Sequence, residues 1–247
     1  MTRDVRELAG AWRKFQRHAY PRPSPDLAPF VEHYWVVAWE YREAYRQLIV
    51  PYPNVHLTFQ DGRARVQGVC SGHQVRVLEG VGGVFGVAFR PGCFRPFLRT
   101  SVSTIRDRQF DAREVFDGEF PEAPQVDSVE RFLRARLPEP DATAERAANI
   151  VATIAANPAL TRVDHLAEEV GTSVRALQRL FTEYVGIGPK WVIRRYRLHE
   201  VTQRLEQGAP ISWADEAARL GYTDQAHFVR DFKTMFGEPP TWYAKRY

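Results

Sequence analysis

The fold is decided by two stretches, residues 166–198, LAEEVGTSVRALQRLFTEYVGIGPKWVIRRYRL, and residues 218–243, ARLGYTDQAHFVRDFKTMFGEPPTWY. Sliding residues 172–196 along the chain by 51 positions gives eight identities, at Thr172/Thr223, Arg179/Arg230, Phe181/Phe232, Gly186/Gly237, Pro189/Pro240, Trp191/Trp242, Arg195/Arg246 and Tyr196/Tyr247. Chance would give only about one or two identities at ordinary amino-acid usage. The second half of the chain therefore repeats one supersecondary unit.

The first copy predicts a helix, a tight turn and a second helix. Thr161 and Asp164 have the spacing of a capping box for the first helix, and Gly171 permits a left-handed turn after it. Ser173 is the predicted N-cap of the second helix, which we expect to end at Gly186. Its inward apolar positions are Val174, Leu177, Phe181 and Tyr184.

The second copy repeats these signals. Ser212 and Asp215 open its first helix, Gly221 supplies the turn, and Thr223 or Asp224 caps its second helix. The predicted inward residues of that helix are Phe228, Phe232 and Met235. Two helices joined by a turn that contains glycine form the helix-turn-helix motif of many DNA-binding proteins.

The outward faces of the second helices carry side chains suited to DNA. In the first copy they are Arg175, Gln178, Arg179 and Thr182, and in the second Gln225, Ala226, Val229 and Arg230. Arg and Gln are residue types that recognise guanine and adenine edges in the major groove. Between the copies, Pro189 opens a predicted helix to about Gln207, whose expected basic side includes Arg194, Arg195, Arg197 and Arg204. Because Arg179 and Arg230 are identical in both copies, they suit a shared phosphate contact better than sequence-specific readout.

These motifs, R-x-F and G-x-x-P-x-x-[WY] in both copies and the spacer helix at Pro189, resemble those of the AraC/XylS family of bacterial transcription regulators. The resemblance covers about residues 145–247 and implies an all-helical domain with two helix-turn-helix motifs. It implies major-groove contacts at Arg175, Gln178 and Arg179, and at Gln225, Ala226, Val229 and Arg230. It also implies promoter double-stranded DNA and RNA polymerase as partners.

Glu216 departs from the family pattern, which has an apolar residue there. A carboxylate at that position must tilt outward or find a partner. Ala226 and Val229 offer only apolar contacts, so the second motif is expected to touch thymine methyl groups or to add little specificity.

The first half of the chain has a different pattern. Val55, Leu57 and Phe59 alternate with polar residues, Asp61-Gly62 supplies a hairpin turn, and Val66 and Val69 follow. Further strands are expected at Gln74–Leu78 and Val84–Phe89, and short helices at Phe94–Leu98 and Ser128–Leu137. The segment Pro138–Pro140 predicts a linker, with Asp141 as the next helix cap. We therefore expect an α+β chain of two domains: a β-rich, sandwich- or barrel-like domain at 1–138 and an all-α double helix-turn-helix domain at 141–247.

The first half is similar, more loosely, to an uncharacterised sensor domain that precedes this DNA-binding module in many actinobacterial regulators. The similarity rests on Phe30–Trp35, Val50–Phe59, Gly86–Gly92 and Asp107–Phe116. It implies control by a small-molecule effector and pairing of two copies as a homodimer. The aromatic residues Tyr34, Trp35, Trp39, Tyr41 and Tyr45 either line an effector pocket or, as we favour, belong to the core.

The composition excludes several classes of protein. The chain has 247 residues, 44% of them hydrophobic and 26% charged, with a net charge of +4, as in globular proteins. It contains no apolar run of about 20 residues and its N-terminal stretch is not a secretory signal, so we expect no membrane partner and a cytoplasmic location. The net charge is +3 over residues 1–140 and +1 over residues 141–247, whereas residues 175–204 alone carry +5. The basic charge is therefore concentrated around the predicted reading helix and the spacer.

Other chemistries are less well supported. His33, His56, His73, Cys70 and Cys93 lack the close spacing of metal ligands, so no metal or cofactor is expected. A DNA-binding redox or metal sensor stays an alternative, because basic neighbours of Cys93 could lower the pKa of its thiol. Gly80–Gly83 resembles a nucleotide-binding loop only superficially. Two rivals stay open: an enzyme with vestigial DNA binding, for which no catalytic pair is present, and an architectural DNA binder without specificity.

Overall fold

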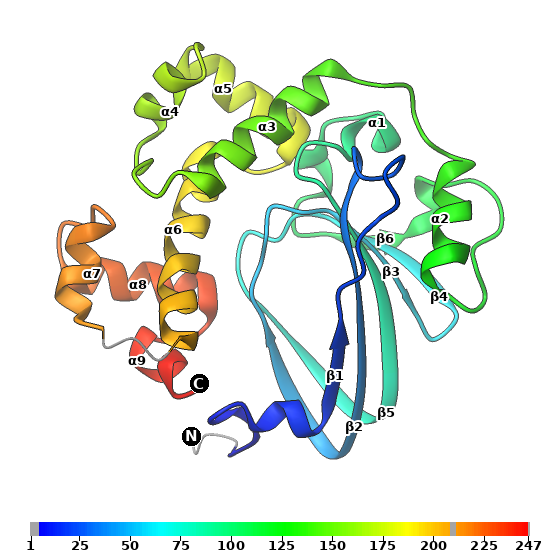
Figure 1. Cartoon of the computed structure of the whole chain (residues 1–247), viewed down its shortest axis with the longest axis horizontal. Coiled ribbons are helices and arrows are strands. Elements are labelled where there is room, and N and C mark those ends of the chain that lie inside the picture. Colours follow the sequence, from blue (N-terminus) through cyan, green and yellow to red (C-terminus); the bar gives the residue numbers. More distant parts are fainter. Residues whose placement is uncertain (1–4, 208–210, 247) are drawn as a thin grey trace.

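The computed structural model describes residues 5–207 and 211–246. Figure 1 shows a twisted β-sheet built by the first half of the chain and a set of helices built by the second half. The strands are β1 (Gln16–Ala19), β2 (Val31–Ile49), β3 (His56–Gln60), β4 (Arg63–Gln67), β5 (Gln74–Phe89) and β6 (Gln109–Asp111). They form one antiparallel sheet in the order β1-β2-β5-β3-β4-β6.

Two helices belong to the sheet region, α1 (Arg95–Leu98) and α2 (Val126–Arg134). The later helices are α3 (Ala142–Ala156), α4 (Val163–Glu169), α5 (Val174–Leu180), α6 (Pro189–Glu206), α7 (Trp213–Arg219), α8 (Gln225–Phe236) and α9 (Pro240–Tyr243). In Figure 1, α6 connects an upper group, α3 to α5, with a lower group, α7 to α9. The predicted α+β class, with a β-rich first half and a helical second half, is confirmed.

The predicted hairpin is present as β3 and β4. Asp61 and Gly62 both have positive φ, 51° and 68°, which is the backbone of the tight turn that matches the twist of two antiparallel strands. The helix expected at Ser128–Leu137 begins earlier, at Val126, because the Ser128 hydroxyl caps the backbone of Gln125 instead of opening the helix. Asp141 caps α3 as predicted, accepting hydrogen bonds from two backbone N–H groups.

The prediction of two separate strands at Gln74–Leu78 and Val84–Phe89 is wrong, because β5 runs unbroken through Gly80–Gly83 along β2. The indole of Trp39 lies where a side chain at Gly82 would be: a Cβ there would come within 2.4 Å of the ring. Trp35 occupies the same space over Gly86. The glycines therefore make room for indole rings within a strand, and Gly80–Gly83 forms no loop.

The apolar core continues across the predicted linker. One cluster of buried side chains runs from Leu27 and Leu57 of the sheet region to Phe181 of the first motif and Ile193 of α6. A smaller cluster belongs to the second motif, around Phe228 and Phe232. The domain boundary at residues 138 and 141 stays a prediction, since no break in the core marks it.

The aromatic residues of β2 pack as core. Tyr34, Tyr41 and Tyr45 are almost fully buried, and the rings of Tyr41 and Tyr45 stack with centroids 4.8 Å apart. Trp39 and Tyr41 join a third cluster with Leu78 and Val84. None of the helices within residues 5–207 and 211–246 is both long enough and apolar enough to span a membrane.

Candidate nucleic-acid interface

The first motif consists of α4, a turn at Gly171 and α5. Gly171 has a φ of 63°, and the Ser173 side chain accepts a hydrogen bond from the Ala176 N–H at 3.2 Å, as predicted. The capping box expected from Thr161 and Asp164 is wrong. Arg162 occupies the N-cap position of α4, and its guanidinium binds the Asp164 carboxylate and lowers the pKa of that group.

The second helix of the first motif begins as an α-helix and continues as a π-helix. Leu177, Phe181 and Tyr184 are buried as expected, whereas Val174 is 37% exposed and does not belong to the inward stripe. After α5, residues Phe181–Val185 form a wider π-helical turn that ends at Gly186, where φ is 88°. The predicted end at Gly186 is therefore confirmed.

The second motif repeats this construction with α7, Gly221 and α8. Ser212 and Asp224 are the N-caps of α7 and α8, and the Asp224 carboxylate accepts from the His227 N–H at 2.7 Å. Phe228, Phe232 and Met235 are buried as predicted. Gly237 ends α8 with a φ of 79°, in the position that Gly186 occupies in the first motif.

The predicted DNA-contacting residues of the two helices lie mostly at the surface. Arg175, Gln178, Arg179 and Thr182 are exposed, as are Gln225, Ala226 and Arg230. Val229 is half-buried against the apolar cluster of the second motif. The Thr182 hydroxyl donates to the Gln178 carbonyl, so its hydrogen is already in use within the helix. The two helices therefore present seven exposed candidate side chains and one that is partly covered.

Arg195 is a correction: it is buried, with 1% of its surface exposed, and cannot reach DNA from there. Its Nε donates to the carbonyl oxygen of Pro51, and its guanidinium lies 3.9 Å from the centre of the Tyr52 ring. Burial lowers its pKa. Arg195 thus attaches α6 to the loop between β2 and β3. Sequence reasoning missed this because the residues it contacts are more than 140 positions away.

Arg194 and Arg197 also serve contacts inside the protein. Arg194 Nη1 lies 3.2 Å from the Asp231 carboxylate of α8, and its side chain is 30% exposed. Arg197 is buried and donates to the Ile154 carbonyl at the end of α3 and to Glu200. The basic side expected along α6 is therefore largely turned inward, where it ties helices together.

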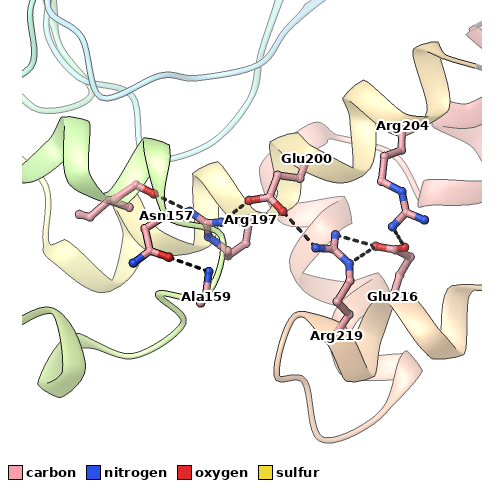
Figure 2. Close-up of polar contacts among 8 residues, drawn as sticks. Asn157, Ala159, Arg197, Glu200, Arg204, Glu216 and Arg219 are labelled. Carbon is pink, nitrogen blue, oxygen red and sulfur yellow. Dashed lines mark hydrogen bonds and ion pairs between the residues drawn. The ribbon is translucent and has the colours of Figure 1, made fainter.

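Glu216 finds its partners inside the protein. It is 3% exposed, and its carboxylate accepts hydrogen bonds from Arg204 of α6 and from Arg219 of α7, the latter at 2.9 and 3.2 Å (Figure 2). Arg219 also donates to Glu200, at 3.1 Å. Of the two outcomes expected for this carboxylate, the second, a buried partner, is therefore confirmed.

The sheet region touches both motifs at equivalent places. At the end of α5, Val102 packs on Gly186 so closely that a Cβ there would come within 2.8 Å of it. At the end of α8, the His73 side chain packs on Gly237 in the same way and donates to the Thr234 carbonyl at 3.2 Å. These contacts were not predicted, since nothing local marks residues so distant in the sequence as neighbours.

Two further contacts attach the sheet region to the helices. The Arg95 guanidinium of α1 lies 2.9 Å from the Glu183 carboxylate and stacks 5.1 Å from the centre of the Tyr184 ring. The Trp191 indole N–H of α6 donates to the Ser71 carbonyl at 2.8 Å. The helices of the second half are therefore held by the sheet region at several points.

The cysteines are not activated thiols. Burial raises the pKa of Cys70 and that of Cys93 to about 11, and at Cys93 it outweighs the opposing effect of Arg90. The alternative of a redox sensor, in which basic neighbours lower the pKa of Cys93, is therefore not supported. Within residues 5–207 and 211–246, no three His, Cys, Asp or Glu side chains are grouped so that they could hold a metal ion.

Residues 166–246 match the family model of a helix-turn-helix domain, and residues 20–111 match a domain of unknown function, DUF6597. GlxA, an HTH-type transcriptional regulator of Rhizobium meliloti (strain 1021), is 36% identical over 81 residues, 33% of this chain and 25% of GlxA. The probable transcription factor PqrA of Proteus vulgaris is 31% identical over 84 residues, 34% of this chain and 68% of PqrA. The chain belongs to the AraC/XylS family.

This AraC/XylS protein is a DNA-binding transcription regulator. The segment of this chain that matches the two relatives covers a quarter of the length of GlxA and about two thirds of the length of PqrA. A solved transcriptional regulator of Chromobacterium violaceum, described as AraC-type, is 29% identical, covers 39% of this chain and 88% of its own, and has a TM-score of 0.36.

Proposed function

We propose that this AraC/XylS regulator reads promoter DNA with the outward faces of α5 and α8. Arg175 and Gln178 bind base edges, while Arg179 and Arg230 contact phosphates near each reading helix. Thr182, Gln225, Ala226 and Val229 complete the two faces. Arg194 pairs with Asp231 of α8 and is therefore assigned no phosphate contact.

The observation that carries this proposal is the exposure of Arg175, Gln178 and Arg179 on one face of a capped helix whose other face is buried. α6 separates the two motifs by 18 residues, which is about 27 Å at 1.5 Å per residue. Successive major grooves on one side of a duplex lie about 34 Å apart. The spacing therefore suits two reading helices in neighbouring grooves.

The test is fluorescence anisotropy of the purified chain on the DNA upstream of its own gene and on a shuffled duplex, at two salt concentrations. A preference of about 10³ or more for the native duplex at physiological salt is expected of a specific regulator. Equal binding to both duplexes with a steep salt dependence would instead identify an architectural DNA binder.

Control by a small-molecule effector is part of the proposal. It is supported by a cavity of about 920 Å³ lined by α1, residues 115–118 and the linker 135–142. Arg95 lines this cavity and also pairs with Glu183 beside the end of α5. A molecule in the cavity would thus contact Arg95, which in turn is paired with Glu183 of the first motif.

A panel of small carboxylic and amino acids, added to the anisotropy assay, tests this part. A compound that shifts DNA affinity should lose its effect in Arg99→Ala, because Arg99 is exposed and lines the cavity. Arg63→Ala is the matched control, an exposed arginine in the β3–β4 hairpin outside the cavity. Equal loss in both variants would place the effector elsewhere.

The family resemblance adds two partners to the proposal: RNA polymerase at the promoter and a second copy of the chain. Light scattering on the purified protein, with and without the selected DNA, tests the second. A mass of one chain under both conditions would remove the homodimer from the proposal.

A further inference from the structure

Five charged side chains form a continuous alternating series along one side of α6, here called the ion-pair chain. Its members are Arg197, Glu200, Arg219, Glu216 and Arg204, drawn in Figure 2. Each carboxylate lies between two guanidinium groups. One end is fixed to the α3 carbonyl of Ile154 through Arg197, and the other end returns to α6 through Arg204.

The ion-pair chain links parts of both motifs. α3 packs against the first motif within the large core, whereas Glu216 and Arg219 are on α7, the first helix of the second motif. Arg194 and Asp231 make a parallel ion pair between α6 and α8, and Tyr222 hydrogen-bonds the same Asp231. Charged contacts therefore fix both helices of the second motif to α6.

The first motif has an apolar side chain where the second has Glu216. Upstream of the turn the two copies are offset by 50 positions instead of 51, because the second copy has one extra residue, Tyr222. Gly171 therefore matches Gly221, Ala167 matches Ala217, and Leu166 is the counterpart of Glu216. Leu166 is fully buried in the large core, and its contacts are apolar and non-directional. A carboxylate held by two guanidinium groups is directional instead, since each hydrogen bond fixes a distance and an angle.

A buried ion pair is weak evidence for stability, because the cost of removing charges from water offsets their attraction. Its better-attested use is to select one geometry among several of similar energy. Glu216 is buried, while the side chains of Arg204 and Arg219 are 40% and 39% exposed and can return to water. What the second motif gains from Glu216 is therefore orientation.

We propose that the ion-pair chain fixes the orientation of α7 on α6, and thereby determines which separation between two half-sites on DNA the regulator accepts. Glu216 is the central positioning residue, acting on α8 through α7. This inference rests on the proposed reading of DNA by both helices. It predicts that loss of the ion-pair chain relaxes the preference for half-site spacing more than it reduces binding.

The experiment starts from duplexes selected by the wild-type chain out of a random library. One base pair is then inserted or removed between the two protected segments, and the loss of affinity is measured for each protein. Glu216→Leu restores the apolar residue type of Leu166, and Glu216→Gln keeps the shape without the charge. The control is Glu206→Gln, an exposed glutamate at the end of the same helix α6.

Wild type and Glu206→Gln should lose about tenfold or more on the altered spacing, as for the loss of one or more base contacts. Both Glu216 variants should lose less than about threefold. The melting temperature of Glu216→Leu should stay close to that of wild type, because the buried charge itself is removed and the arginines left behind, Arg204 and Arg219, are partly exposed and can return to water. If Glu216→Leu keeps the wild-type spacing loss, the proposal is wrong.

Hydrogen exchange in the absence of DNA tests separately whether the ion-pair chain holds α7 in place. Amides of α7 and α8 should exchange faster in Glu216→Gln than in wild type, while those of α4 are unchanged. Unchanged exchange in α7 overturns the inference even if DNA is read as proposed. The wild-type chain could also select no DNA sequence while α7 still exchanges faster in the variant. That result overturns the proposed function and the role in half-site spacing. It leaves the ion-pair chain only as the contact that holds α7.

Discussion

The two helix-turn-helix motifs share their local signals and differ in what holds them. Gly186 and Gly237 end their recognition helices with the same left-handed backbone, and Ser173 and Asp224 cap them in the same way. The first motif, however, is built into the large core that it shares with the sheet, whereas the second has a small core of its own. A repeated sequence thus repeats the local structure, while the surroundings of each copy decide how it is attached.

The outward faces of α5 and α8 also differ between the two motifs. The first presents Arg175, Gln178 and Arg179, and the positions equivalent in the repeat are Ala226, Val229 and Arg230. Hydrogen-bonding side chains can distinguish all four base pairs in the major groove, but apolar ones recognise only the thymine methyl group. If DNA is read as proposed, we expect the first motif to carry most of the sequence readout, while the contribution of the second motif depends on how it is oriented on α6.

Phe181→Ala and Phe232→Ala form the matched pair with the largest expected effect. Both rings are fully buried, so each deletion should cost about 3–5 kcal/mol of unfolding free energy. In hydrogen exchange, the Phe181 variant should open the sheet and the first motif together, because they share a core. The Phe232 variant should open α7 to α9 with little change in the sheet. Equal opening of the sheet in both variants would contradict the comparison.

Gly186→Ala should cost more than Gly237→Ala. Both substitutions force a side chain into a left-handed backbone, at about 1–2 kcal/mol. At Gly186 the new Cβ would also meet the Val102 backbone at 3.2 Å, whereas at Gly237 it would meet the ends of the His73 and Leu48 side chains, which can move. We expect about 2–3 kcal/mol at Gly186 and about 1–2 kcal/mol at Gly237, measured by urea unfolding. The reverse order would show that the second motif is the more tightly enclosed one.

Removing the reading side chains tests the difference between the two faces. Arg175→Ala or Gln178→Ala should weaken binding to the selected DNA by about 1–3 kcal/mol and relax the base preference. Val229→Ala, at the position equivalent to Gln178, should change affinity by no more than about 0.5 kcal/mol, because it removes only apolar contact. Anisotropy against single-base variants of the duplex measures both quantities. A larger effect at Val229 would reverse the assignment of readout to the first motif.

Acid should weaken the sheet more than the attachment of α6. Burial lowers the pKa of His56 to about 4, and burial with the Arg195 charge lowers that of His199 to about 4. The unfolded chain takes up these protons near pH 6.5, so stability is present above that pH and is lost as the pH falls from 6.5 toward 4.

Between pH 7 and pH 5 we expect a loss of about 2 kcal/mol for His56 and about 1 kcal/mol for the more exposed His199. Urea unfolding at the two pH values measures the loss. His199→Gln should reduce the pH dependence by the smaller amount and His56→Gln by the larger one. An unchanged pH dependence in both variants would show that other groups are responsible.

The parts of the fold that could be predicted from the sequence are those governed by neighbours along the chain. Gly171, Ser173 and Asp224 act within three or four residues, and the hairpin turn at Asp61 and Gly62 is equally local. The exposure of Arg175 and Gln178 followed from helical periodicity alone. These features required no knowledge of the surrounding structure.

What could not be predicted depends on partners far away in the sequence. From the sequence, Arg195 is expected to be a surface cation on a basic helix. In the fold, Pro51 and Tyr52 lie against it and it is buried. The continuity of β5 depends on Trp39 filling the space over Gly82, more than 40 residues away. In each case the tertiary contact overrides the local pattern.

The core shared by the sheet and the first motif also constrains how the chain folds during synthesis. The buried cluster that begins with Leu27 is completed only by Ile193, so the sheet leaves the ribosome well before the helices that cover it. At a rate of about 5–20 residues per second, the stretch from residue 140 to residue 193 takes roughly 3–10 s to make. During that interval the part of this cluster that only the later helices cover is exposed to water, and we expect chaperones to bind the nascent chain there.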